Sequence, residues 1–373
     1  MRTRFAGPSL LFVGAFTLSV ALPACGKKDA AAEGGAAPAS GDAAAASGDA
    51  AAPAAAGSVN ADPKVLADFR KVLDGFGECK LTGKAFDPDE SLPESLRLEG
   101  WDAGDPEGCD EAWTAYDEFV RPQVADEAKA AIFRDVALAS LDHPKAPSRY
   151  MVVMSMLDLP KSLEVGPAHI AHIGGALAKE TDGNVASVLG EYVGNIELAN
   201  EAQAAAIGEI MKSTANEAFV DGFMGSWGCQ EGACTGVVRA WAENPNPAIR
   251  NVAFNDLVNL DESVLSDAAL CDELAKSLAH EDAALVGEAA ARIFETGEPC
   301  DPKADAVLAQ LDARKGKVDE LGLVFLPVWD SGRDFEGEQK AKVLEAAKAI
   351  VAAKPDDQDL MAAAQDCVSA YSG

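Results

Sequence analysis

Positive charge is scarce in this 373-residue chain. Asp and Glu number 61 against 31 Lys and Arg, which gives a formal net charge of −30. A protein that binds nucleic acid through phosphate contacts needs a basic face, and no clustering of Lys and Arg provides one. The sequence therefore argues against a nucleic-acid partner. The acidic excess has two interpretations: a solvated, self-repelling surface, or an acidic face for a basic partner or for cations.

Motifs of catalysis and cofactor binding are also missing. The chain has no GxSxG, P-loop, GxGxxG or kinase motif. His169 and His172 share a helix face, but no paired carboxylate completes a metal motif such as HExxH, so we expect histidines that the fold satisfies or that face solvent. We therefore predict no catalytic residue, no metal site and no cofactor. An enzyme whose site is assembled across a groove remains the alternative.

The apolar run near the N-terminus is too short to span a bilayer comfortably. Leu10–Val20 ("LLFVGAFTLSV") follows Arg2 and Arg4, which is the pattern of a signal peptide. The run leads into "LPAC", residues 22–25, which resembles the lipobox of bacterial lipoproteins. The resemblance implies cleavage before Cys25, diacylglycerol on its thiol and an N-acyl chain such as palmitate, which together would hold the chain at a membrane. An ordinary secretory signal with an incidental cysteine is the alternative.

The residues after Cys25 favour a membrane-anchored protein on a tether. Gly26 stands where Asp would argue for retention at the inner membrane, so we expect the outer membrane of a bacterial cell envelope. Residues 26–61 are almost all Ala, Gly, Ser, Asp and Pro, and they lack the large apolar residues that offset ordering entropy. We predict a signal peptide over 1–24 and a lipidated cysteine with a disordered linker over 25–61.

Helical patterns begin after the linker. Asp62 and Pro63 form an N-cap followed by Pro at the first helical position. Between residues 62 and 125 we expect a helix that ends near Gly75, a loop over most of residues 78–109, and a second helix over 110–120. From residue 126 to 373 one theme recurs: a helix, a polar turn and a second amphipathic helix.

The spacing of these turns predicts an all-α helical repeat. A period in the thirties to forties with two helices per unit is typical of an α-solenoid. Two of the intervals are about double the others, so we expect degenerate units near residues 213–228 and 317–331. The recognisable turns begin near Asp142, Asp182, Asn244, Glu281 and Pro355.

One of these turns carries a family resemblance. The segment "NPNPAIRNVAFNDL", residues 244–257, resembles the turn and second helix of a HEAT repeat. Pro247 starts the helix, and Arg250 occupies a position typical of that family. The resemblance implies a degenerate HEAT-like solenoid over residues 126–373, with an irregular helical bundle as the alternative fold.

The cysteine count agrees with an oxidising compartment. Of eight cysteines, Cys25 is assigned to lipid, and the others should largely pair in the cell envelope. Cys367 is left over as a buried thiol in the last helix. The spacing CxxxxC and the helical surroundings argue against a redox pair or a zinc site in the sequence "SWGCQEGACTG". We predict three disulfides: Cys79–Cys109, Cys229–Cys234 and Cys271–Cys300.

These observations favour an interaction scaffold over an enzyme. A helical repeat presents a long continuous surface, which suits binding and does not by itself imply catalysis. The expected partners are the lipid bilayer, through acylated Cys25, and a protein, which the acidic surface would favour as basic. An envelope enzyme, such as a hydrolase or processing factor, and a structural component of envelope assembly are the alternatives.

Overall fold

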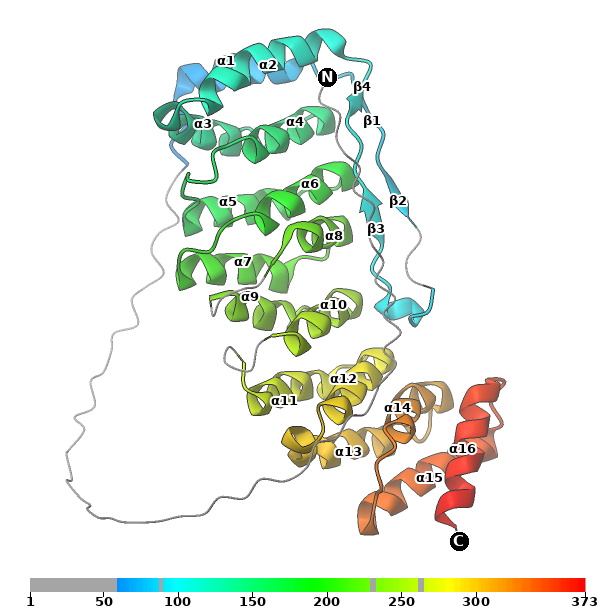
Figure 1. Cartoon of the computed structure of the whole chain (residues 1–373). Helices are drawn as coiled ribbons and strands as arrows, with labels where there is room; N and C mark the ends of the chain where they lie inside the picture. The colour runs from blue at the N-terminus through cyan, green and yellow to red at the C-terminus, as the bar shows by residue number, and fades with distance from the viewer. Residues whose placement is uncertain (1–58, 87–89, 229–232, 261–264, 373) are drawn as a thin grey trace, which may run out of the picture. The chain divides into compact units, whose positions relative to one another are not determined.

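The computed structural model describes residues 59–86, 90–228, 233–260 and 265–372 (Figure 1). The predicted signal peptide, Cys25, nearly all of the predicted linker and Cys229 lie outside this part. The described part is mostly α-helical, as the sequence predicts. Its helices are α1 (Pro63–Asp74), α2 (Asp110–Val124), α3 (Glu127–Ala139), α4 (Ala146–Leu157), α5 (Pro167–Leu177), α6 (Gly183–Gly194), α7 (Glu201–Ser213), α8 (Glu217–Ser226), α9 (Ala233–Trp241), α10 (Pro247–Val258), α11 (Asp267–Lys276), α12 (Ala283–Thr296), α13 (Ala304–Arg314), α14 (Val318–Asp330), α15 (Gly337–Ala353) and α16 (Gln358–Tyr371).

Local sequence explains where the first helix begins. The carboxylate of Asp62 accepts the backbone N–H groups of Lys64 and Val65, both at 2.9 Å, so it satisfies donors that have no intrahelical partner. Phe69 is fully buried and meets Phe133 of α3 edge-on, with 5.0 Å between ring centroids. This aromatic contact joins α1 to the first helix of the repeat.

From α3 onward the helices form two layers. The even-numbered helices α4, α6 and α8 contact one another in turn, as do α10, α12, α14 and α16. The odd-numbered helices α3, α5, α7 and α9 form the other layer, and α13 contacts α15 in the same way. Figure 1 shows this alternation from α3 to α12. The apolar core lies between the layers, with Ile207 of α7 and Phe219 of α8 among its fully buried residues.

A polar corner connects the two helices of a pair and recurs along the chain. At each corner a side chain accepts the backbone N–H of the residue two positions later. In all five corners that later residue is the N-cap of an even-numbered helix, and in four of them its side chain also accepts backbone N–H groups of the helix. The corners recur about every 30 to 37 residues, which is a helical-repeat period. The pairs are His143 with Lys145, Glu180 with Asp182, Thr214 with Asn216, Asn244 with Asn246, and His280 with Asp282.

Half-buried arginines and a buried asparagine connect one corner to the next. Arg149 of α4 donates to His143 O in its own corner. It also donates two hydrogen bonds, at 2.7 and 2.8 Å, to the carboxylate of Glu180 in the next corner. Arg250 stands at the same place in α10, where it donates to Asn244 O at 2.8 Å. Asn244, which is fully buried, donates back to Thr214 O at 2.8 Å. The corners therefore form a continuous polar edge along this part of the molecule.

The two degenerate units that the spacing requires are present. One corner lies at Thr214–Asn216 between α7 and α8, and another turn lies between α13 and α14 at residues 315–317. Neither turn contains the Pro that marks the corners before α4 and α10. The expected helix pairs therefore exist without the expected sequence signature.

Residues 79–109 differ from the expected loop. The chain runs out and back as a hairpin-like segment, here called the strap, in which β1 (Lys80–Leu81) pairs antiparallel with β4 (Pro106–Glu107). Farther out, β2 (Lys84–Phe86) pairs with β3 (Gly100–Asp102). The 3₁₀ turn η1 (Glu94–Leu96) lies between these two strands in the sequence. The strap lies along the even-numbered helices: β1 contacts α4, β3 contacts α6 and α8, and η1 contacts α10 and α12 (Figure 1). Strands of two or three residues are too short to show an alternation of apolar and polar residues, so the sequence does not predict them.

Side-chain oxygens near the starts of the even-numbered helices hold the strap. Trp101 donates its backbone N–H to Asp221 at 2.9 Å, and Glu99 donates to Glu217 at 2.8 Å, both on α8. Gly104 donates to Asn184 of α6 at 3.0 Å. The strap thus binds partly through its backbone; its buried Leu96 side chain and the Asp105 carboxylate, which accepts a hydrogen bond from Tyr150 of α4, complete the contact.

Close packing of α6 against α8 depends on glycine. A Cβ atom at Gly190 would overlap the backbone oxygen of Phe219, and one at Gly222 would overlap the backbone oxygen of Ser187. Only a residue without a side chain lets the two helix backbones approach this closely. In contrast, a Cβ at Gly225, also on α8, would meet no atom within 4 Å.

We predict that Gly222→Ala destabilises the fold and that Gly225→Ala does not. The first change forces α6 and α8 apart and should lower the free energy of unfolding by about 1–3 kcal/mol. The second replaces a poor helix former on an open surface and should raise that free energy by up to about 1 kcal/mol. Urea unfolding followed by far-UV circular dichroism measures both. Equal effects of the two variants would contradict the close contact.

Candidate functional site

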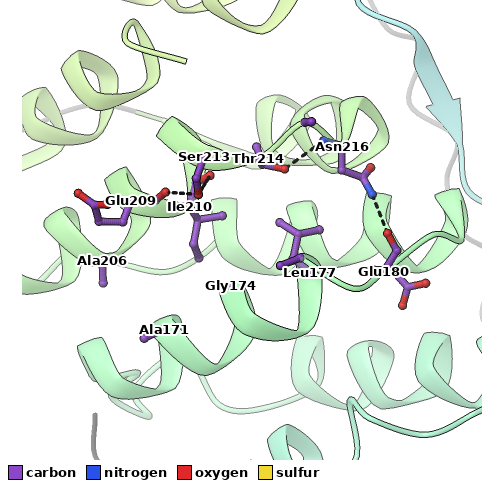
Figure 2. Close-up of a pocket in the computed structure, with 12 residues that line it drawn as sticks. Ala171, Gly174, Leu177, Glu180, Ala206, Glu209, Ile210, Ser213, Thr214 and Asn216 are labelled. Atoms are coloured by element: carbon purple, nitrogen blue, oxygen red, sulfur yellow. Dashed lines mark hydrogen bonds between the residues drawn. The ribbon is translucent and has the colours of Figure 1, made fainter. Parts of the chain in front are cut away.

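A groove runs between α5 and α7 on the odd-numbered layer, with a volume of about 710 Å³ (Figure 2). Its apolar part comes from small and medium side chains, and its polar part comes from the ends of the two helices and the corner after α7. The lining residues are Ala171, Gly174, Leu177, Ala178, Glu180, Ala206, Glu209, Ile210, Ser213, Thr214, Ala215 and Asn216. We call this the α5/α7 groove.

Small residues determine the depth of the α5/α7 groove. Gly174 faces Ile210 so closely that an added Cβ would lie 2.9 Å from the Ile210 side chain. Ala171 of α5 and Ala206 of α7 lie on opposite helices of the same groove (Figure 2). Larger residues at these positions would fill the space, so the alanines and glycines keep it open.

Polar groups border the groove and are anchored by the fold. Asn216 donates its amide to Glu180 O at 3.4 Å, and Ser213 donates its hydroxyl to Glu209 O at 2.6 Å (Figure 2). The Glu209 side chain is exposed, and no Lys, Arg or His lines this groove. The Ser213 hydroxyl proton is thus committed to a helix carbonyl. The arrangement suits binding of an apolar segment beside a positive charge.

Glu180 lines the groove, but its carboxylate is occupied by hydrogen bonds that stabilise the fold. Its carboxylate accepts two bonds from Arg149 and further bonds from the backbone N–H groups of Thr181 and Asp182, both at 2.9 Å. Its side chain is only 5% exposed. The hydrogen bond to Glu180 raises the pKa of Arg149 above its usual value. An ion pair this well satisfied supports the corner and is not available to a ligand.

A second hollow, the corner groove, adjoins the first and shares Ala171 and Glu180 with it. It has a volume of about 800 Å³ and lies between the corner after α3 and one face of α5. Its side chains include both signs of charge, from Asp142, Arg149 and Lys179. The corner groove also contains two histidines, His143 and His172.

All four histidines of the chain use ring nitrogens in the fold. His143 accepts the Lys145 N–H at Nδ1, so the neutral ring carries its proton on Nε2, which lies 3.2 Å from the Asp74 carboxylate. His280 accepts the Asp282 N–H in the same way. These two residues act as corner acceptors.

His169 and His172 point to different partners. His169 accepts the Gly166 N–H at Nδ1 and lies 3.5 Å from Asp135 at Nε2, while His172 Nε2 donates to Leu138 O at 3.0 Å. Burial, followed by the charge of Arg134, lowers the pKa of His169. Within the described part of the chain, no three His, Cys, Asp or Glu side chains group as metal ligands would.

Two of the predicted cysteine pairs lie at disulfide distance. Cys79 and Cys109 join the two ends of the strap, with 5.9 Å between their Cα atoms. Cys271 and Cys300 are bonded across 5.3 Å between Cα atoms. Cys271 lies inside α11, which begins at Asp267. Cys300 lies in the 3₁₀ segment η3 (Glu298–Lys303) after α12.

The remaining cysteines have different surroundings. Cys234 is buried in α9, and Cys229, its predicted partner, lies outside the described residues. Cys367 is a free thiol that is fully buried in α16. Burial, with the charge of Asp366, raises the pKa of Cys367 to about 11. A thiol with so high a pKa reacts slowly, because only the thiolate attacks an alkylating agent.

Among the residues that the structure describes, no helix is both long and apolar enough to cross a bilayer.

Comparison of the chain with protein-family models, with curated proteins and with solved structures gave no match.

Neither groove was foreseen from the sequence. Ala171, Gly174 and Ala206 carry no chemical motif, and in a sequence they are indistinguishable from residues that merely favour or tolerate a helix. Their concentration on the facing sides of α5 and α7 is the one signal that was available, and it acquires meaning only when the two helices are paired.

We predict a defined order of thiol alkylation. In the native protein at neutral pH, Cys367 should resist iodoacetamide; urea without reductant should expose it. Cys79, Cys109, Cys271 and Cys300 should become labelled only after reduction, because their sulfurs are bonded. Peptide mapping by mass spectrometry measures each site. Labelling of Cys271 or Cys300 before reduction would contradict that disulfide, and free thiols at both Cys229 and Cys234 would contradict the third predicted pair.

Proposed function

We propose that this chain is a lipid-anchored protein of a bacterial cell envelope that acts as a helical-repeat scaffold for another protein. The sequence "LPAC" at residues 22–25 supports the anchor, since acyl chains on Cys25 would hold the protein at a membrane without a spanning helix. The stacked helix pairs support the scaffold, because such repeats offer extended surfaces for binding. The pairs also support a HEAT-like assignment of the repeat.

The α5/α7 groove is the proposed contact surface for the partner. The observation that carries this assignment is its composition: an apolar floor of small residues bordered by the exposed Glu209, with no basic side chain in the lining. A partner segment that inserts apolar side chains and places Lys or Arg beside Glu209 would match both properties. The acidic excess of the whole chain would increase the rate of association with such a segment.

We predict that Cys25→Ser releases the protein from membranes. The serine variant cannot carry the thioether-linked lipid, so the mature chain should move from the membrane pellet to the soluble fraction. Cys367→Ser is the matched control, because this buried cysteine lies in α16 and should leave membrane association unchanged. Continued retention of Cys25→Ser at the membrane would refute the lipid anchor.

We predict that Ala206→Arg abolishes partner capture while Ala205→Arg preserves it. Ala206 lines the α5/α7 groove, whereas Ala205 is exposed on the same helix and does not line it. An arginine at position 206 would fill the groove and oppose a basic partner, and we expect recovery to fall at least about tenfold. Crosslinking in intact envelopes followed by affinity capture of the wild type and both variants measures this.

Three outcomes of the capture experiment would count against the scaffold or against the α5/α7 groove as its contact surface. Recovery of no stable partner by the wild-type protein would contradict the proposed function itself. Equal recovery by both variants would contradict the groove as the contact surface. Equal loss in both variants would indicate a general effect of added charge on α7 and would contradict the groove in the same way.

A further inference from the structure

A third cavity lies on the opposite edge of the repeat from the corners. The loop after α4, residues 158–166, and the loop after α6, residues 195–200, enclose it together with the last turns of those helices. Its volume is about 560 Å³, which falls within the range of small-molecule sites. It shares no lining residue with the α5/α7 groove or the corner groove. We call it the Tyr192 cavity.

The walls of the Tyr192 cavity are fixed by the fold. Gln203 is 1% exposed and joins the two enclosing loops, since its amide donates to Val165 O at 2.9 Å and accepts the Ala199 N–H at 2.7 Å. The apolar lining includes Met156, Leu159, Leu163 and Ile196. A cavity with braced walls and an apolar interior binds a ligand without a large ordering cost.

Tyr192 supplies a polar group without a protein partner among the described residues that line this cavity. The side chain lines the cavity and is 7% exposed, yet its hydroxyl forms no hydrogen bond with the described residues. The other tyrosines differ: Tyr116 donates to Met151 O, Tyr150 donates to Asp105, and the Tyr371 oxygen accepts the Phe335 N–H. The hydroxyl is therefore free to bond to a ligand that enters the cavity, in the place that water would otherwise take.

The Tyr192 hydroxyl is neutral at physiological pH, as an ordinary tyrosine is, and burial strengthens this preference. Desolvation raises the pKa of Tyr192 to about 12. The oxygen therefore retains its proton at physiological pH and still has lone pairs to accept a hydrogen bond from a ligand.

The charges around the cavity are mostly negative. Glu164, Glu191 and Glu197 line it, and none of these carboxylates forms an ion pair with another described residue. Lys161 is the basic residue of the lining, and Arg134, outside the lining, donates to Glu164 O at 2.7 Å and places a second positive charge near the Tyr192 hydroxyl. This excess of carboxylates attracts a cation and repels an anion.

We propose that the Tyr192 cavity binds a small organic cation with an apolar body and an ammonium group. The apolar body lies among Leu159, Leu163 and Ile196, and the ammonium lies among the lining carboxylates with the Tyr192 oxygen as an acceptor. This site is separate from the α5/α7 groove, so tests of the Tyr192 cavity do not depend on the proposed binding of a partner protein.

Calorimetric titration of the full-length protein with three probes of one size tests the proposal. Hexylammonium, 1-hexanol and hexanoate share an apolar chain and differ in the charge of the head. We expect hexylammonium to bind most tightly, hexanol more weakly and hexanoate least, with the preference for the cation declining as salt is added. Failure of hexylammonium to bind, or equal affinity for hexylammonium and hexanoate, would overturn the proposal.

Two variants locate the binding. Tyr192→Phe removes a hydroxyl that has no protein partner, so the fold should persist while affinity for hexylammonium falls about threefold to tenfold. Tyr371→Phe is the matched control and should bind as the wild type does. An unchanged affinity in Tyr192→Phe would overturn the role of that hydroxyl. Leu163→Trp should fill the cavity and remove binding of all probes that the wild type binds; persistent binding would place the site elsewhere.

Discussion

Reversal of the chain between antiparallel helices is the constraint on which the rest of the structure depends. Every reversal leaves helix-end N–H and C=O groups without intrahelical partners, and in a stack these ends lie against neighbouring pairs. The corners at Glu180 and Asn244 satisfy those groups with side chains, so the turns need only a few residues. Arg149 then reaches from its own corner to Glu180 in the next. Removal of either charge would leave the other buried and unpaired, which is strongly destabilising.

The tight corners and the glycine contacts produce unequal faces. Gly190 and Gly222 let the α6 and α8 backbones touch, whereas α5 and α7 meet through the side chain of Ile210. The odd-numbered layer therefore retains a groove along facing alanines. At the opposite edge, the longer loop of residues 158–166 lines the Tyr192 cavity together with the loop of residues 195–200. Both candidate sites thus result from how helix pairs are joined, and neither requires a specialised motif.

The sequence predicted the helical repeat well because burial imposes a periodic pattern. Helix α6 carries apolar residues at helical spacing from Val185 to Val193, and these are buried together with most of the other residues of the helix. Asp62 caps α1 as predicted. The strap was missed because its backbone, not its side chains, makes the contacts with Asp221 and Glu217. Tyr192 belongs to the same apolar stripe. Such a stripe predicts which face of a helix is buried, but it does not predict whether a hydroxyl on that face has a hydrogen-bond partner. Tertiary contacts decide such features, and one sequence does not contain them in readable form.

The strap occupies one binding surface of the repeat with a segment of the same chain. Oxygens on Asn184, Glu217 and Asp221 accept N–H groups from an extended segment, so part of the acidic excess serves to bind backbone. Desolvation beneath the strap raises the pKa of Asp221, while the hydrogen bond from Trp101 opposes the shift. Because this segment covers the starts of α6 and α8, a partner segment cannot use the same oxygens without displacing it. The odd-numbered layer and the loop edge have no such cover from the strap, and the two proposed sites lie there.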